Sequence, residues 1–121
     1  MPTANLLTRA REAVTAHEVA ERLWARGIKV PVTDPADLDA LDEDEIVAGY
    51  RSAAKDDPEP GGNHSRAFWH GWRNGMSDRR FREPDAAQRE LARRLHERGD
   101  YARMSVRIFG AGQNGGEVGN G

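Results

Sequence analysis

The stretch HSRAFWHGWRNG, residues 64–75, constrains the fold more than any other part of the chain. It holds half of the Trp and Phe residues of the protein: Phe68, Trp69 and Trp72. Wound as an α-helix at ~100° per residue, these aromatic side chains share one face, and Gly71 and Gly75 lie beside them. Each glycine costs a helix about 1 kcal/mol relative to alanine. We therefore expect an amphipathic helix whose glycines let another backbone approach closely.

The composition predicts a small, mainly helical protein. Only 20 of the 121 residues are Leu, Val, Ile or Phe, whereas 17 are Ala, which favours helix but supplies little core. Disulfides and thiolate metal sites are excluded because the chain has no Cys. No apolar run approaches the ~18 residues of a membrane span, so we expect a cytoplasmic protein that has no contact with a membrane.

Apolar periodicity and capping signals predict five helical segments: 4–26, a turn from Pro35, 42–54, 65–80 and 84–98. The Pro- and Gly-rich loop 55–63 is expected to fold the third segment back on the fourth as a central antiparallel helical hairpin. We expect one helical domain over residues 1–109.

Two further features complete the predicted fold. Alternating apolar residues at 28–32 and 104–108 predict a minor two-stranded β element. Six glycines in residues 110–121 predict a disordered tail. The tail also matches the dinucleotide-binding pattern at Gly110–Gly115, but only six residues follow it, too few for the helix and second strand that this site needs.

No pattern for catalysis, a cofactor or a metal ion is found. The four histidines lie apart in the sequence and are predicted to be surface residues: His17, His64, His70 and His96. The acidic run 42–45 lacks the alternating ligands and the turn glycine of a calcium loop. We expect neither an enzyme nor a bound cofactor.

Charge is segregated along the chain. Residues 34–59 carry ten acidic and two basic residues, a net charge of −8, whereas residues 64–107 carry eleven Arg and six acidic residues, a net charge of +5. This polarity favours either a basic face for nucleic acid or an acidic face for a basic partner. The alternative is that the two halves neutralise each other across the fold.

Residues 48–80, AGYRSAAKDDPEPGGNHSRAFWHGWRNGMSDRR, resemble the ribosome modulation factor family. The first helix carries the Gly49-Tyr50 pair, and the second carries the remaining matches: Phe68, Gly71, Trp72, Arg73, Met76, Asp78 and Arg79. A similar pattern occurs in short uncharacterised proteins of proteobacterial phages and prophages. The resemblance implies a helical hairpin that binds the small ribosomal subunit and silences translation.

Three hypotheses of function follow, and all are non-catalytic. In the first, the protein binds a host nucleoprotein complex, the ribosome or its RNA, and modulates it by occlusion. The expected contacts are Arg66, Trp69, Arg73, Arg79, Arg80, Arg82, Arg89 and Arg93. Arginines interleaved with aromatic residues favour this hypothesis, because such rings stack on exposed bases.

The second hypothesis is a phage-encoded inhibitor of a host defence complex, resembling anti-CRISPR proteins. Its acidic residues would imitate nucleic acid on a basic protein groove: Asp42, Glu43, Asp44 and Glu45. The third hypothesis is a self-associating helical module, a homodimer formed through Trp69 and the two glycines beside it, Gly71 and Gly75, which we call the glycine seam.

Overall fold

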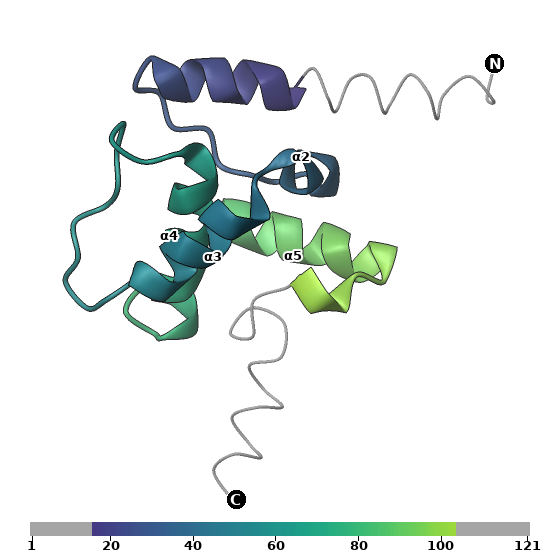
Figure 1. The fold of residues 1–121 in the computed structure, drawn as a ribbon. Coiled ribbons are helices and arrows are strands. Elements are labelled where there is room, and N and C mark those ends of the chain that lie inside the picture. Colours follow the sequence, from purple (N-terminus) through teal and green to yellow (C-terminus); the bar gives the residue numbers. More distant parts are fainter. Residues whose placement is uncertain (1–15, 104–121) are drawn as a thin grey trace, which may run out of the picture.

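The computed structural model describes residues 16–103, and every regular element in this range is helical (Figure 1). A helix over residues 16–25 is followed by the labelled elements: α2 (Pro35–Ala40), α3 (Glu43–Ser52), α4 (Arg66–Asp78), α5 (Ala86–Arg98) and the short 3₁₀ helix η2 (Tyr101–Arg103). The mainly α fold class is confirmed.

The helices begin at residues whose side chains accept hydrogen bonds from the first turn. The carboxylate of Asp42 accepts bonds from the first turn of α3, and the hydroxyl of Ser65 does so for α4. Asp85 and Gln88 form a reciprocal capping box at the start of α5. The observed helix starts therefore follow from short local patterns.

Helices α3 and α4 run in the same general direction, so the predicted antiparallel hairpin is wrong. Near their N-terminal ends, Ser65 Oγ donates a hydrogen bond to Glu45 Oε1 at 2.9 Å. Near their C-terminal ends, Tyr50 Oη donates to Asp78 Oδ2 at 2.7 Å. Figure 1 shows the connection between them swinging out to one side and returning to the start of α4.

The length of this connection permits the return. A helix of 10 residues such as α3 is about 15 Å long. Residues 53–65, thirteen positions at up to ~3.3 Å each, span more than twice that distance. A long loop between two helices therefore does not imply an antiparallel pair.

The backbones of α3 and α4 touch at glycines from both helices. A Cβ atom added at Gly71 would lie 1.9 Å from the carbonyl oxygen of Ile46, and one added at Gly49 would lie 2.0 Å from that of Phe68. At Gly75, an added Cβ would lie 2.6 Å from the carbonyl oxygen of Tyr50. Only glycine fits at such distances, so the close backbone approach expected from the sequence is present.

Helix α4 contributes to both apolar clusters of the core. Its Ala67 belongs to a cluster of residues from the 28–41 region and α5: Val32, Leu38, Leu41, Leu91 and Leu95. Its aromatic face joins Trp24 and Ala53 in a second cluster that contains Trp69, Trp72 and Met76. The helix is therefore central to the molecule and does not lie on its surface.

The polar face of α4 is buried as well, contrary to the expectation of a solvent-facing side. Arg66, His70, Arg73 and Ser77 all lie in the interior. The hydrophobic pattern separates apolar from polar residues, but it does not show whether other elements cover the polar side.

No strand forms among residues 16–103, so the β element predicted at 28–32 is absent. Val32 is buried in the first apolar cluster, whereas Ile28 is 49% exposed. The carbonyl oxygen of Val30 accepts a hydrogen bond from Arg66 Nε at 2.8 Å. The alternation of apolar residues at 28–32 therefore reflects a single inward-facing residue, Val32, in an extended segment that is not a strand. The second predicted strand, 104–108, and the tail, 110–121, lie outside the described residues.

Candidate functional site

Three of the predicted contact residues are interior. Arg66, Trp69 and Arg73 are 0%, 4% and 6% exposed, so they cannot form a surface for RNA or a partner in this fold. The homodimer interface proposed through Trp69 and the glycine seam is also excluded here, because Gly71 and Gly75 already contact α3.

Arg66 connects three parts of the chain. Its guanidinium donates to both carboxylate oxygens of Asp37, at 2.9 and 2.7 Å, and to Glu21 at 3.2 Å. His17 Nδ1 lies 2.7 Å from the same Asp37 carboxylate. Burial alone would raise the pKa of Asp37, but the hydrogen bonds from Arg66 and His17 hold it below its ordinary value. This network has a structural role.

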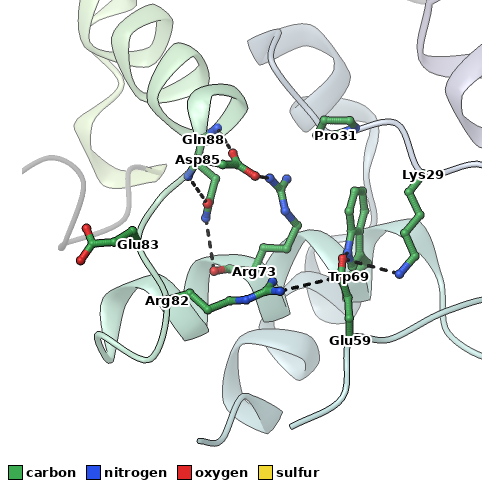
Figure 2. Close-up of a pocket in the computed structure, with 9 residues that line it drawn as sticks. All are labelled: Lys29, Pro31, Glu59, Trp69, Arg73, Arg82, Glu83, Asp85 and Gln88. Atoms are coloured by element: carbon green, nitrogen blue, oxygen red, sulfur yellow. Dashed lines mark hydrogen bonds and ion pairs between the residues drawn. The ribbon is translucent and has the colours of Figure 1, made fainter. Parts of the chain in front are cut away.

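Arg73 belongs to the wall of a polar pocket of about 410 Å³ (Figure 2). Its guanidinium pairs with Asp85 and lies 4.8 Å from the centre of the Trp69 ring. Burial alone would raise the pKa of Asp85, yet bonds from the first turn of α5 and the charge of Arg73 lower it. Arg73 is therefore committed to positioning α5.

Glu59 closes the other side of this pocket, as Figure 2 shows. Its carboxylate accepts a hydrogen bond from Trp69 Nε1 at 2.6 Å and lies 3.5 Å from both Lys29 Nζ and Arg82 Nη2. These partners lower its pKa against the opposing effect of burial. The pocket is lined by three cations and three carboxylates: Lys29, Arg73, Arg82, Glu59, Glu83 and Asp85. Because its charges balance, it has no excess charge with which to attract an ion.

The other five predicted arginines are exposed, and they differ in their partners. Arg93 pairs with Glu90 and Glu97 on the surface of α5. In contrast, Arg80 and Arg89 make no ion pair with any residue of the described chain. Within residues 16–103, the charge of these two side chains is therefore not neutralised by a carboxylate.

Residues 79–82, Arg-Arg-Phe-Arg, form what we call the arginine turn, directly after α4. Phe81 is 39% exposed between its charged neighbours. Arg79 lies 4.8 Å from the centre of the Tyr50 ring and donates to the Tyr50 carbonyl oxygen at 2.7 Å, while Arg82 lies 5.0 Å from the centre of the Trp72 ring. The turn thus presents three guanidinium groups and one aromatic ring at the C-terminal end of the α3–α4 pair.

Tyr50 fixes the position of the arginine turn relative to α3. Burial and the hydrogen bond to Asp78 raise the pKa of Tyr50 to about 12, so the hydroxyl remains a donor at neutral pH. The three described links from this side chain and its carbonyl oxygen hold the end of α4 against the end of α3.

The acidic residues of the second hypothesis lie at the opposite, N-terminal end of the same pair. Asp42 caps α3, and Glu45 accepts the bond from Ser65. Glu43 and Asp44 are exposed and form no ion pair within residues 16–103. The parallel direction of α3 and α4 therefore places the two candidate surfaces at opposite ends of one unit.

The two charged halves of the sequence also neutralise each other in part. Across the fold, described arginines pair with acidic residues of the 34–59 region: Arg66 with Asp37, Arg82 with Glu59, Arg94 with Asp34, and Arg98 and Arg103 with Asp39. The net charge of a segment consequently overstates the charge that its surface presents.

The remaining expectations concern histidines, metals and membranes. His70 is buried, so its predicted surface position is wrong. Within residues 16–103, no three His, Asp or Glu side chains gather as a metal site. None of the described helices has the length and apolar character needed to cross a bilayer.

No protein-family model, curated protein or solved structure matches the chain.

Proposed function

We propose that this protein is a non-catalytic binding protein that occludes a host nucleoprotein complex, with ribosomal RNA as the contacted component. Support comes from one surface, the arginine turn, where Phe81 is exposed among Arg79, Arg80 and Arg82.

The physical argument rests on charge and shape. Guanidinium groups bind phosphate oxygens in a bidentate manner, and binding releases counterions from the nucleic acid. Arg79 is held against the ring of Tyr50, so less side-chain entropy is lost when it binds. Arg80 is free of carboxylate partners within the described chain. The surface is therefore organised before a ligand arrives.

The test measures binding to purified small ribosomal subunits at several salt concentrations. Arg80→Glu combined with Arg89→Glu should weaken binding strongly and lower the slope of log K against log salt by roughly 0.7 to 0.9 for each lost phosphate contact. Arg22→Glu with Arg26→Glu is the matched control, because both residues are exposed on the helix at 16–25 and its end. Equal weakening by both pairs would indicate attraction by net charge alone and contradict a defined site.

A second candidate function rests on the acidic end of α3. Glu43 and Asp44 are exposed without cationic partners in the described chain, as a nucleic-acid mimic requires. If the protein is an anti-CRISPR-like inhibitor, Glu43→Gln with Asp44→Asn should abolish inhibition of a defence complex, and the arginine variants should retain it. The two candidates thus predict opposite outcomes from the same set of variants.

A further inference from the structure

The same backbone motif closes the C-terminal ends of three helices. In each, one N–H bonds to the carbonyl oxygen five residues earlier and the preceding N–H bonds to the carbonyl oxygen three residues earlier. The motif requires one residue with positive φ. These residues are Gly27 (φ 84°), Gly99 (φ 78°) and Arg80 (φ 63°).

Arg80 is the exception among these three helix ends. An L-residue is disfavoured in the left-handed conformation, and glycine is not. The Arg80 backbone makes the motif, with its N–H bonded to Ser77 at 3.1 Å, but the side chain makes no hydrogen bond or ion pair within residues 16–103. The only other non-glycine residue with positive φ in the described chain is Asp56, a residue type that tolerates this conformation. The guanidinium of Arg80 therefore makes no hydrogen bond or ion pair within residues 16–103 that would stabilise the fold.

Phe81 departs from the usual motif in the same way. Its N–H bonds to the Met76 carbonyl oxygen at 2.9 Å, and a hydrophobic residue at this position commonly packs back on the helix. Here the ring remains 39% exposed. A cation without a carboxylate partner among residues 16–103 and an exposed ring are thus adjacent on a backbone that is fixed by two hydrogen bonds.

We propose that Arg80 and Phe81 form a binding site for one unpaired RNA nucleotide, with the Phe81 ring stacked on the base and Arg80 on a phosphate. This inference rests on the proposed function and names the form of RNA that the site takes. Aromatic side chains stack on bases that are splayed out of a helix, whereas the bases of an RNA duplex are already stacked on each other. Phosphates alone would not require an exposed ring.

The probes are a fluorescein-labelled single-stranded RNA of about 12 nucleotides and the same strand annealed to its complement, a length within the site sizes of single-strand binders. Binding is measured by fluorescence anisotropy. Wild-type protein should bind the single strand more tightly than the duplex. Phe81→Leu should weaken single-strand binding about tenfold and leave duplex binding unchanged, because leucine is apolar but has no ring to stack. Phe81→Tyr keeps the ring and should retain binding.

Arg80→Gly provides the second, independent readout. It should lower the slope of log K against log salt for the single strand by about 0.7, as expected for one lost phosphate contact. It should also raise the melting temperature by a few degrees, roughly 4 °C, because glycine relieves the strained φ. A weaker binder that is more stable cannot owe its loss of binding to unfolding.

The outcomes separate this inference from the proposed function. If wild-type protein binds neither RNA at low salt, both are wrong. If it binds both RNAs equally and Phe81→Leu changes neither affinity, the protein binds RNA but the stacking site is wrong. If Arg80→Gly leaves the salt slope unchanged, Arg80 contacts no phosphate and the inference is overturned.

Discussion

The body of α4 and the arginine turn that follows it use the same residue type in opposite ways. Within the helix, Arg66 and Arg73 are buried, and each forms an ion pair with an aspartate of another segment. Two residues past the helix end, Arg80 is exposed and without a carboxylate partner in the described chain. The charge of an arginine therefore says little about its role until its partners are known.

The physical reason for the difference is desolvation. A buried guanidinium requires a carboxylate and several acceptors, because an uncompensated buried charge costs several kcal/mol. Asp37 and Asp85 meet that requirement for the two arginines of α4. A surface guanidinium has water as its partner and needs no such arrangement. Unpaired exposed arginines are thus the ones that a ligand can use.

The largest effect that tests this contrast is expected at Arg66. Arg66→Gln leaves the buried carboxylate of Asp37 without its main partner and should lower the free energy of unfolding by about 3–5 kcal/mol. Denaturant unfolding measures the loss. Arg80→Gln is the matched control and should not destabilise the protein. Similar losses from both variants would show that the contrast between the helix and the turn is wrong.

The glycine seam should give the next largest effect. Gly71→Ala places a methyl group where the Ile46 carbonyl oxygen now lies, so α3 and α4 must separate, and we expect a loss of about 3 kcal/mol. At Gly61, an added Cβ meets no atom within 4 Å, so Gly61→Ala should be neutral or slightly stabilising. Thermal unfolding of the two variants makes the comparison, and a stable Gly71→Ala protein would contradict the close packing.

Acid should destabilise the body of α4 through His70. Burial, then the charges of Arg73 and Arg66, lower the pKa of this histidine from 6.5 to about 4, against the opposing effect of Asp37. The unfolded chain therefore binds a proton that the folded protein excludes. Stability is complete above pH 6.5 and falls as the pH drops toward 4, by roughly 2 kcal/mol between pH 8 and pH 5.

The control for this pH dependence is His70→Gln, which has no titrating group and should flatten the curve of unfolding free energy between pH 8 and pH 5. The aspartates and Glu59, whose pKa values are lowered, contribute only further down in pH. An unchanged curve in His70→Gln would assign the acid sensitivity to another group.

The smallest effect is expected when the glycine that closes α5 is replaced by arginine, the residue type that closes α4. Gly99 closes α5 with the same pattern of hydrogen bonds as Arg80 closes α4, and like Arg80 it has a positive φ. Gly99→Arg should lower the free energy of unfolding by about 1 kcal/mol, because an L-residue then adopts the left-handed conformation. RNA binding should not increase, since the residue after Gly99, at the position that corresponds to Phe81, is Asp100 and has no ring to stack on a base. A gain in affinity would mean that added charge alone is sufficient.

The helices predicted at 42–54, 65–80 and 84–98 lie close to α3, α4 and α5, and short local signals explain the bounds that the structure shows. Asp42, Ser65 and the Asp85–Gln88 pair begin the helices, and Gly27 and Gly99 follow their ends. Each signal acts over three or four residues, so it does not depend on the rest of the chain. The glycine seam was predictable for a related reason, because a costly residue inside a helix implies a close neighbour.

The errors concern contacts between distant segments. The direction of α4 relative to α3 depends on a long connection whose path no local rule fixes. The burial of Arg66 depends on Asp37 and Glu21, which lie 29 and 45 positions earlier in the sequence. Arg80 was among the predicted contacts, but its special conformation was missed. The helix at 16–25 and α5 are each followed by a glycine with positive φ, whereas α4 is followed by Arg80. This missing glycine was the sequence signal for the unusual conformation of Arg80.

The Arg66 network has a consequence for how the molecule unfolds. Its partners come from the helix at 16–25, the extended segment before α2, and α2 itself. If any of these segments detached while α4 stayed packed, a guanidinium would remain in the interior with too few acceptors. Partly open species are therefore high in energy, and the domain should lose its structure in a single cooperative step. Tryptophan fluorescence and circular dichroism would then report the same transition midpoint.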